Sequence, residues 1–400
     1  MITCYLDSQD YSVLTDPKLM TPERARVRDD LLYLSRSNQV RFAFSEITVC
    51  ENVSPTPEAS HLAELKGELI SDLCGSNALV SIDKLVGMES RALAGKFDFM
   101  QNAFDRNGRW FPDIFDDLEL PNLWDVVKEG LENEMKKMGL SRQERRAKTR
   151  SFVKSGQPRA VLRQYFEQLD TQSLVRKIVE KYPMKEEYAT MIGGYFSGNS
   201  SEKDFIDALI GSLNDIRWIM KWFTTDYALS SPIAERVRKP GRDLGALMRS
   251  LSQTSIGWSE FLKEAGMDRN PTKKGGAVAL KWKEAEQQQL VAMAKRMRTR
   301  TTEKIENITA SDVRTYCPGL SACVSSFYSS VWANVGAGRK EEASDSQPVD
   351  ALHAFYAPYV KIFRADRFMA PHIQKSVEGS DTIVVPLLSK LTDVLNLHLR

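Results

Sequence analysis

The sequence predicts an α/β protein whose sheet is shared between the two ends of the chain. Short β-rich runs occur at residues 2–6 and 40–44 near the start, and at 359–363 and 382–386 near the end. Helical patterns separate these runs, and this alternation is typical of a parallel sheet. Residues 96–347 contain long helical patterns and few strand-like runs, so we expect a mainly α-helical inserted domain there.

The first part of the sheet domain is expected over residues 1–95. The strand at 2–6 ends at Asp7, and a turn-like stretch leads to Thr21 and Pro22, which are suited to the cap and first turn of a helix reaching about residue 37. The strand at 40–44 runs into a short helix containing Glu51. Further helices are expected at 62–74 and 81–93, from the spacing of their apolar residues.

The inserted domain and the second part of the sheet domain follow. Helical patterns cover 123–138, 201–223, 245–251 and 281–297, and all seven tryptophans fall within 96–347, which indicates a packed core. Residues 336–348 have the composition of a linker. Over 348–400 we expect a helix at 349–357 that stops at Pro358, then two strands and a closing helix.

The bulk composition indicates a cytoplasmic protein that does not cross a membrane. The 400 residues are 42% hydrophobic but contain only short apolar runs, and acidic residues occupy the start of the chain, where a signal peptide would be basic and apolar. The five cysteines are scattered without zinc-site spacing, so we interpret them as buried thiols. A net charge of +2 does not by itself indicate nucleic-acid binding.

Acidic residues follow the strand ends. Ligands of parallel sheets bind beyond the carboxyl ends of the strands. Asp7 follows the first strand, Asp366 follows the strand at 359–363, Glu51 lies a turn or two into the helix after 40–44, and Asp350 starts the helix before 359. If the first and third of these strands are parallel neighbours, the four carboxylates face one point.

Such a cluster indicates a site for Mg²⁺ or Mn²⁺. Neighbouring carboxylates raise one another's pKa, and a hard divalent cation relieves this. An ion held there can activate a water for phosphodiester hydrolysis. The simpler interpretation of each acid alone is a helix cap or a solvated loop charge, but their common placement at strand ends favours a site.

These residues bear a family resemblance. Residues 5–8, the stretch from Ser45 to Glu51, and residues 350–359 followed by 363–366 resemble the motifs of PIN domains, in the family's order. The resemblance implies a three-layer PIN-like fold and metal-dependent RNA cleavage, with Asp7, Glu51, Asp350 and Asp366 as catalytic metal ligands. It covers roughly residues 1–95 and 348–400, and leaves the long middle of the chain unmatched.

Four further residues are candidates for the acidic site or its surroundings. Glu46 competes with Glu51, but it lies at the strand end, whereas the family's glutamate lies on the helix. Asp10 is interpreted as a turn residue, and Glu89 as a minor acidic neighbour. His353, three residues after Asp350, could hydrogen-bond a metal-bound carboxylate, or could equally be a histidine packed in the core.

A basic segment is the expected RNA-binding surface. Phosphate contacts give affinity that depends on salt and not on sequence. The segment is residues 142–154, and six of its residues are the expected phosphate contacts: Arg142, Arg145, Arg146, Lys148, Arg150 and Lys154. Runs at 236–242 and 295–300 would extend the track, although solvated helix faces have the same composition. Few aromatic residues are interleaved, so strong base stacking is not expected.

Other functions were weighed against a nuclease of single-stranded RNA. An Asp-dependent phosphatase would carry a second Asp two residues after Asp7, where this chain has Gln9. No phosphate-binding Gly-rich loop or serine-hydrolase elbow occurs. A catalytically silent PIN-like module that binds a regulatory protein partner remains the alternative from another class. Among nuclease roles, a toxin or a defence enzyme is favoured.

Overall fold

The computed structural model describes residues 1–53, 57–95, 103–111, 138–154, 157–158, 202–225, 227–298, 307–336 and 347–399, with a few single positions besides. Contacts divide the chain into two units, Met1–Pro112 with Tyr227–Arg400, and Asp113–Asp226. The expected inserted domain was 96–347, whereas this division groups the helices after 227 with the sheet. Most of the expected helix at 123–138 and most of the linker at 336–348 lie outside the described residues.

A parallel sheet of four strands in the order β2-β1-β7-β8 joins the two ends of the chain, which establishes an α/β fold. The strands are β1 (Ile2–Tyr5), β2 (Val40–Ala43), β7 (Ile362–Arg364) and β8 (Ile383–Val385). Cys4 pairs with Ile362 and Tyr5 with Phe363, so β1 and β7 are the parallel neighbours that the site requires.

The N-terminal helices follow the expected order with one correction. Their bounds are α1 (Ser8–Thr15), α2 (Pro22–Arg36), α3 (Glu46–Asn52), a 3₁₀ turn η1 (Pro57–Ala59), α4 (Ser60–Cys74) and α5 (Ile82–Leu93). Thr21 caps α2 as predicted, and Ser45 and Ser81 cap α3 and α5. The turn expected after Asp7 is wrong: Asp7 and Asp10 form a reciprocal capping box that starts α1.

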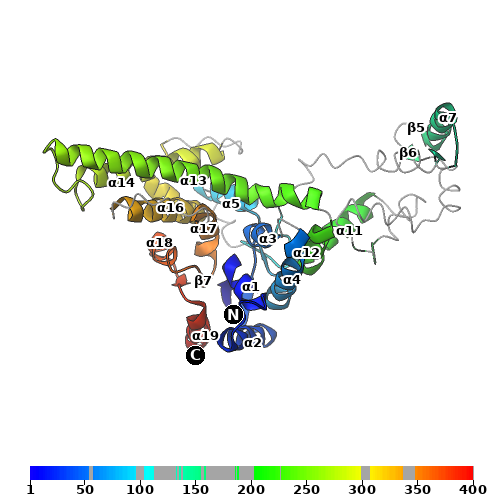
Figure 1. The fold of residues 1–400 in the computed structure, drawn as a ribbon, viewed down its shortest axis with the longest axis horizontal. Helices are drawn as coiled ribbons and strands as arrows, with labels where there is room; N and C mark the ends of the chain where they lie inside the picture. The colour runs from blue at the N-terminus through cyan, green and yellow to red at the C-terminus, as the bar shows by residue number, and fades with distance from the viewer. Residues whose placement is uncertain are drawn as a thin grey trace. The chain divides into compact units, whose positions relative to one another are not determined.

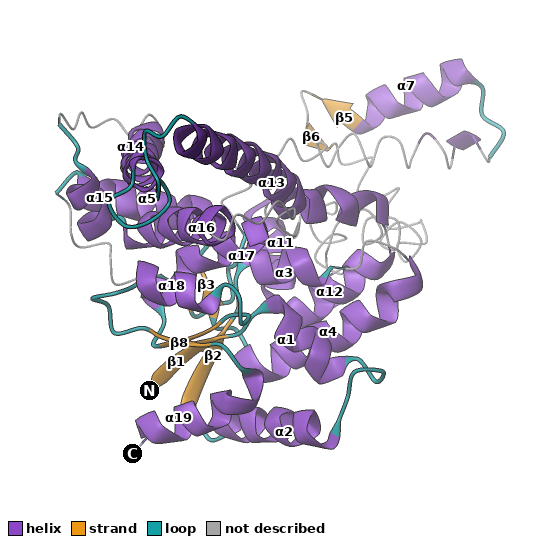
Figure 2. Ribbon diagram, turned by 60° about the vertical axis from the view of Figure 1, so that its left-hand side comes forward, coloured by secondary structure: helices purple, strands orange, loops and turns teal. Residues whose placement is uncertain are grey.

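The C-terminal elements are α17 (Gln347–His353), a 3₁₀ helix η4 (Ala354–Tyr359), α18 (Ala370–Ser376), η5 (Leu388–Lys390) and α19 (Leu391–Leu399). The strand expected at 359–363 begins later, at Ile362. The reason is that the buried residues of η4 pack against α16 (Pro318–Gly336) and prolong the helical segment to Tyr359. The sheet lies between α18 on one side and α2 with α19 on the other (Figures 1 and 2).

Helices from the middle of the chain complete this unit. They are α13 (Tyr227–Glu264), α14 (Ala277–Arg298), α15 (Ala310–Tyr316) and α16 (Pro318–Gly336), together with a small pair of strands, β3 (Ala78–Leu79) and β4 (Phe104–Asp105). α16 packs against η4, α17 and α18, and α13 packs against α3, α16 and α17. These contacts are the reason why the helices after 227 belong with the sheet.

The second unit is described by itself. Its elements are α7 (Arg142–Phe152), the strand pair β5 (Val153–Lys154) and β6 (Gln157–Pro158), α11 (Glu202–Asn214) and α12 (Ile216–Thr225). The single helix expected at 201–223 is wrong, since it breaks at Asp215. There the Asp215 carboxylate accepts a hydrogen bond from the Trp218 backbone at 3.1 Å and starts α12.

Candidate active site

The predicted acidic residues lie where the strand ends place them. Asp7 follows β1 and caps α1, its carboxylate accepting the Gln9 backbone N–H at 3.0 Å. Asp366 follows β7, and its carboxylate accepts the Met369 backbone N–H at 2.5 Å. Glu51 lies in the second turn of α3 after β2, and Asp350 lies in α17. All come from the unit that contains the sheet.

Asp7, Asp350, His353 and Asp366 line one cleft, whose volume is about 10 Å³. Burial, followed by the negative charges of Asp7 and Asp366, raises the pKa of Asp350 to about 8, with Glu51 adding to the effect. Burial also raises the pKa of Asp7. The four predicted carboxylates therefore share one electrostatic environment, in which Asp350 holds its proton more tightly than a free aspartate does.

His353 forms hydrogen bonds with both Glu51 and Tyr5. Its side chain is buried, and its Nε2 lies 2.5 Å from the Glu51 carboxylate and 3.3 Å from the Ser8 hydroxyl. Burial lowers the pKa of His353, but the contacts with Tyr5 and Glu51 outweigh it and raise that pKa well above its ordinary value. A protonated His353 donates from Nε2 to Glu51 and from Nδ1 to Tyr5, so it fixes the orientation of Glu51.

Tyr5 contacts His353 and was not among the site residues predicted from the sequence. The buried Tyr5 hydroxyl lies 2.6 Å from His353 Nδ1, 2.7 Å from the Ser45 hydroxyl and 3.0 Å from the Thr48 hydroxyl. Ser45 and Thr48 also form the capping box of α3. The Ser-x-x-Thr spacing in the sequence predicts this capping box. Only the structure shows that the same two hydroxyls also hydrogen-bond to the Tyr5 hydroxyl.

Two other acids have structural roles of their own. Asp10, interpreted from sequence as a turn residue, is instead buried and ion-paired with Arg364 at 3.0 Å. Glu89 is fully buried and accepts hydrogen bonds from the Gly319 and Leu320 backbone N–H groups, which start α16. It therefore serves as a cap for α16.

Glu46, which competed with Glu51 in the sequence analysis, is buried at the start of α3. Its negative charge raises the pKa of Tyr356, whereas Glu51 contacts His353. The two glutamates therefore face different neighbours, and Glu51 is the one associated with the cleft.

The donor chemistry of the cleft suits Mg²⁺ or Mn²⁺, because carboxylate oxygens are the ligands these ions prefer. The raised pKa of Asp350 indicates negative charge that an added cation would relieve. The side chains are not arranged as a complete metal site: among the described residues, no three acidic, histidine or cysteine side chains are grouped closely enough to hold a metal ion. The carboxylates fit such an ion in kind, and would have to turn toward it to ligate it together.

Comparison with known proteins does not identify a family. No family model, curated protein or solved structure matches this chain. The resemblance to PIN domains therefore stays a prediction that rests on the motifs and on the placement of the acidic residues.

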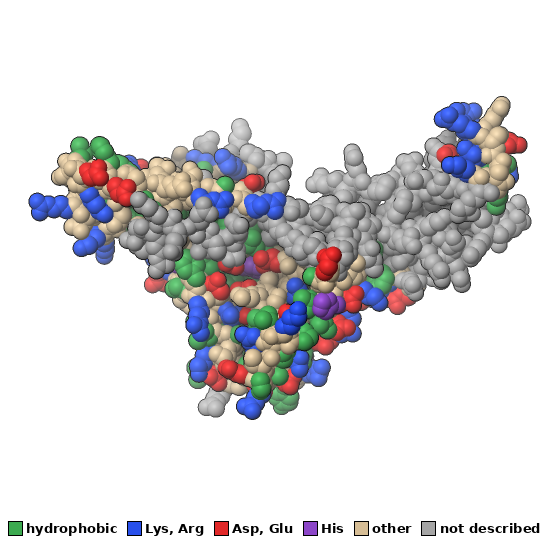
Figure 3. All heavy atoms as spheres, in the orientation of Figure 1, with side chains coloured by type: hydrophobic (Ala, Val, Ile, Leu, Met, Phe, Trp, Pro, Cys, Tyr) green, Lys and Arg blue, Asp and Glu red, His purple; other side chains and the backbone are tan. Residues whose placement is uncertain are grey.

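The predicted RNA-binding residues lie in the second unit. Lys and Arg side chains gather over α7 (Figure 3), where Arg142, Arg146, Lys148 and Arg150 are exposed. Arg145 is partly buried and donates to the Leu140 carbonyl at 2.7 Å. Lys154 lies in β5, and its side chain is outside the described part of the chain. The helix thus presents a basic face.

Two further expectations bear on location. All five cysteines are free thiols, four of them buried and Cys323 partly so. Within the part of the chain that the structure describes, no helix has both the length and the apolar character needed to span a bilayer.

Proposed function

We propose that this protein is a metal-dependent endoribonuclease of the PIN type that hydrolyses phosphodiester bonds of single-stranded RNA. One observation carries the proposal: acidic residues from three other segments, up to 359 positions apart in the printed sequence, act electrostatically on the same carboxylate, Asp350. A fold spends stability on such a concentration of like charge when function requires it.

Asp7, Asp350 and Asp366 would hold a Mg²⁺ or Mn²⁺ ion, with Glu51 beside them. When bound, the ion supplies a nucleophilic water at neutral pH and offsets the charge of the phosphodiester. The chain's own residues hold the site in place. Hydrogen bonds from the Gln9 and Met369 backbone N–H groups fix the carboxylates of Asp7 and Asp366 at strand ends. Tyr5 and His353 orient Glu51.

The exposed arginines of α7 support RNA as the substrate, because they offer sequence-independent phosphate contacts. Within this class we favour the role of a toxin or a defence nuclease in the cytoplasm, one whose activity is controlled by a regulatory protein partner. An Asp-dependent phosphatase is less well supported, since the position of its second Asp is Gln9.

The second candidate is a catalytically silent module that binds a protein partner. Two observations favour it. The acidic cleft has a volume of only about 10 Å³, close to that of a single water, and His353 already occupies an oxygen of Glu51. Activity measurements on the intact chain distinguish a silent module from a nuclease.

The test is cleavage of labelled single-stranded RNA by the full-length protein with Mn²⁺ or Mg²⁺, with chelator as a control. Asp7→Asn and Asp366→Asn are each expected to reduce the rate by about 100-fold or more, the upper end of what altered partners of metal ligands cost. Asp381→Asn, at an exposed position of the same unit, serves as the matched variant and should retain full activity. Undiminished cleavage by both site variants would refute the assignment.

A further inference from the structure

Arg364 is a buried cation whose hydrogen bonds are incomplete. Its side chain is 10% exposed, and its Nη2 pairs with Asp10 at 3.0 Å. Within the part of the chain that the structure describes, its Nε and Nη1 are closed to solvent and have no hydrogen-bond partner. An arginine has five N–H donors, and leaving them unmet in the interior is costly, so the buried Arg364 guanidinium favours further negative charge nearby.

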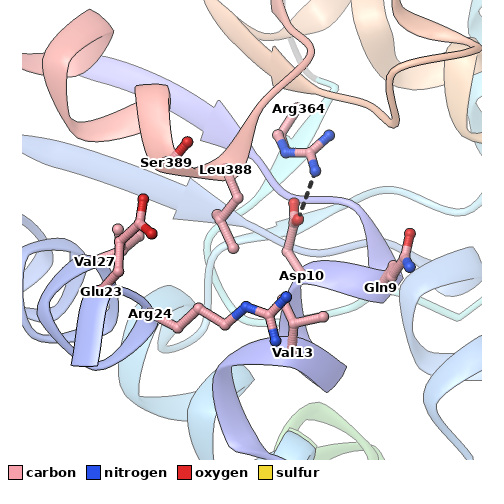
Figure 4. A pocket seen from close by; sticks show the side chains of 9 residues that line it. All are labelled: Gln9, Asp10, Val13, Glu23, Arg24, Val27, Arg364, Leu388 and Ser389. Carbon is pink, nitrogen blue, oxygen red and sulfur yellow. Dashed lines mark ion pairs between the residues drawn. The ribbon is translucent and has the colours of Figure 1, made fainter. Parts of the chain in front are cut away.

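A cavity of about 290 Å³ opens beside this guanidinium (Figure 4). Arg364 from β7 and Arg24 from α2 extend toward it from different elements, with Asp10 between them (Figure 4). The other lining residues combine polar and apolar side chains: Gln9, Val13, Glu23, Val27, Leu388 and Ser389. This volume is at the low end of the range for small-ligand pockets, about 300 Å³, and suits a single nucleotide unit.

The charges around the cavity leave the arginines available to an anion. Both oxygens of Asp10 are already engaged, one by Arg364 and the other by the Asp7 backbone N–H at 3.2 Å. Asp10 therefore holds Arg364 in position. Glu23, the other carboxylate of the lining, is exposed to solvent, where its charge is screened. Arg24 uses one nitrogen to donate to the Leu19 carbonyl, which anchors its guanidinium.

Arg364 also lines the acidic cleft, together with Asp7, Asp350 and Asp366. One residue thus borders both the predicted cleavage site and the larger cavity. A phosphate held against it would belong to a nucleotide next to the one positioned for cleavage.

We propose that the cavity between Arg364 and Arg24 binds one phosphate-bearing nucleotide unit of the RNA strand beside the acidic site. Arginine suits this role, because its planar guanidinium matches the geometry of phosphate oxygens. Gln9 and Ser389 offer hydrogen bonds to the sugar, and Val13, Val27 and Leu388 offer apolar contact. The assignment to RNA rests on the proposed nuclease function, whereas the recognition of a phosphate rests on the cavity itself.

The test measures binding without cleavage. Uridine 5′-monophosphate, uridine and inorganic phosphate are titrated by calorimetry into the full-length protein in the presence of chelator, so the result does not depend on metal or on hydrolysis. We expect the monophosphate to bind more tightly than the other two probes. Arg24→Gln and Arg364→Gln should each weaken this binding by about tenfold or more, as expected for a charge-assisted hydrogen bond.

Arg367→Gln, at an exposed position outside the cavity, is the matched control and should bind normally. Because Arg364→Gln could disturb the fold by releasing Asp10, Arg24→Gln gives an independent measurement. Equal affinity for uridine and its monophosphate, or unchanged affinity in Arg24→Gln, would overturn the proposal. Inorganic phosphate binding as tightly as the monophosphate would overturn the nucleotide assignment. Failure of the nuclease proposal alone would instead appear as intact binding without metal-dependent cleavage.

Discussion

Glu89 offers a quantitative test of how this fold uses a buried carboxylate. It is fully buried on α5, and burial raises its pKa to about 7 despite the hydrogen bonds from Tyr359, Leu320 and Gly319, which lower it. The Tyr359 hydroxyl donates to it at 2.5 Å. The perturbation is Glu89→Gln, which keeps the size of the side chain and removes its titration.

Proton linkage gives the direction in which pH changes the free energy of unfolding. The folded state holds the Glu89 proton up to about pH 7, whereas an unfolded glutamate, with its ordinary value of 4.5, releases it earlier. The folded state therefore binds more protons between these values, and this contribution to stability is present at low pH and is lost as the pH rises through 7. Between pH 5 and pH 8 the wild type loses roughly 2–3 kcal/mol of its free energy of unfolding that the variant does not lose.

The assay is urea unfolding of both proteins at pH 5 and pH 8, followed by tryptophan fluorescence. The free energy of unfolding of Glu89→Gln, relative to wild type, should rise by roughly 2–3 kcal/mol across this interval. Glu68→Gln, at an exposed position on α4, should show no such change. Parallel pH dependences for wild type and Glu89→Gln would show that Glu89 titrates normally and would refute the reasoning.

Two further predictions concern other parts of the chain. A Cβ at Gly319 would lie 2.6 Å from the Phe355 carbonyl oxygen, so Gly319→Ala should lower the free energy of unfolding by about 1–3 kcal/mol. A Cβ at Gly257 would meet nothing within 4 Å, so Gly257→Ala should raise the free energy of unfolding by about 0.5–1 kcal/mol. Equal effects of the two substitutions in thermal or urea unfolding would contradict this reasoning. Replacing three exposed arginines of α7 with Gln should weaken single-stranded RNA binding and reduce its salt slope by about 2, measured by fluorescence anisotropy; these are Arg142, Arg146 and Arg150. Substituting three exposed basic residues of the other unit should leave that slope unchanged, and an equal loss there would show that α7 has no special role; these are Arg269, Lys273 and Lys274.

The sequence by itself determined the main elements and the positions of the acidic residues along them. Apolar runs located the strands, and local signals such as Thr21 before Pro22 fixed helix starts, because a capping side chain acts on its own neighbours. The same local chemistry was available at Asp7 and Asp10, where the capping box was overlooked. Asp215, by contrast, gave little warning that it would split a helix.

Only the tertiary structure decided which of these residues meet. Tyr5 and His353 are separated by 348 positions yet lie in hydrogen-bond contact, and Arg364 of β7 pairs with Asp10 of α1. Glu89 looks like an ordinary helix residue until α16 packs over it. Such contacts depend on the register of parallel strands from opposite ends of the chain and on the packing of helices between them. Periodicity and capping signals act over a few residues and carry no information about partners that distant.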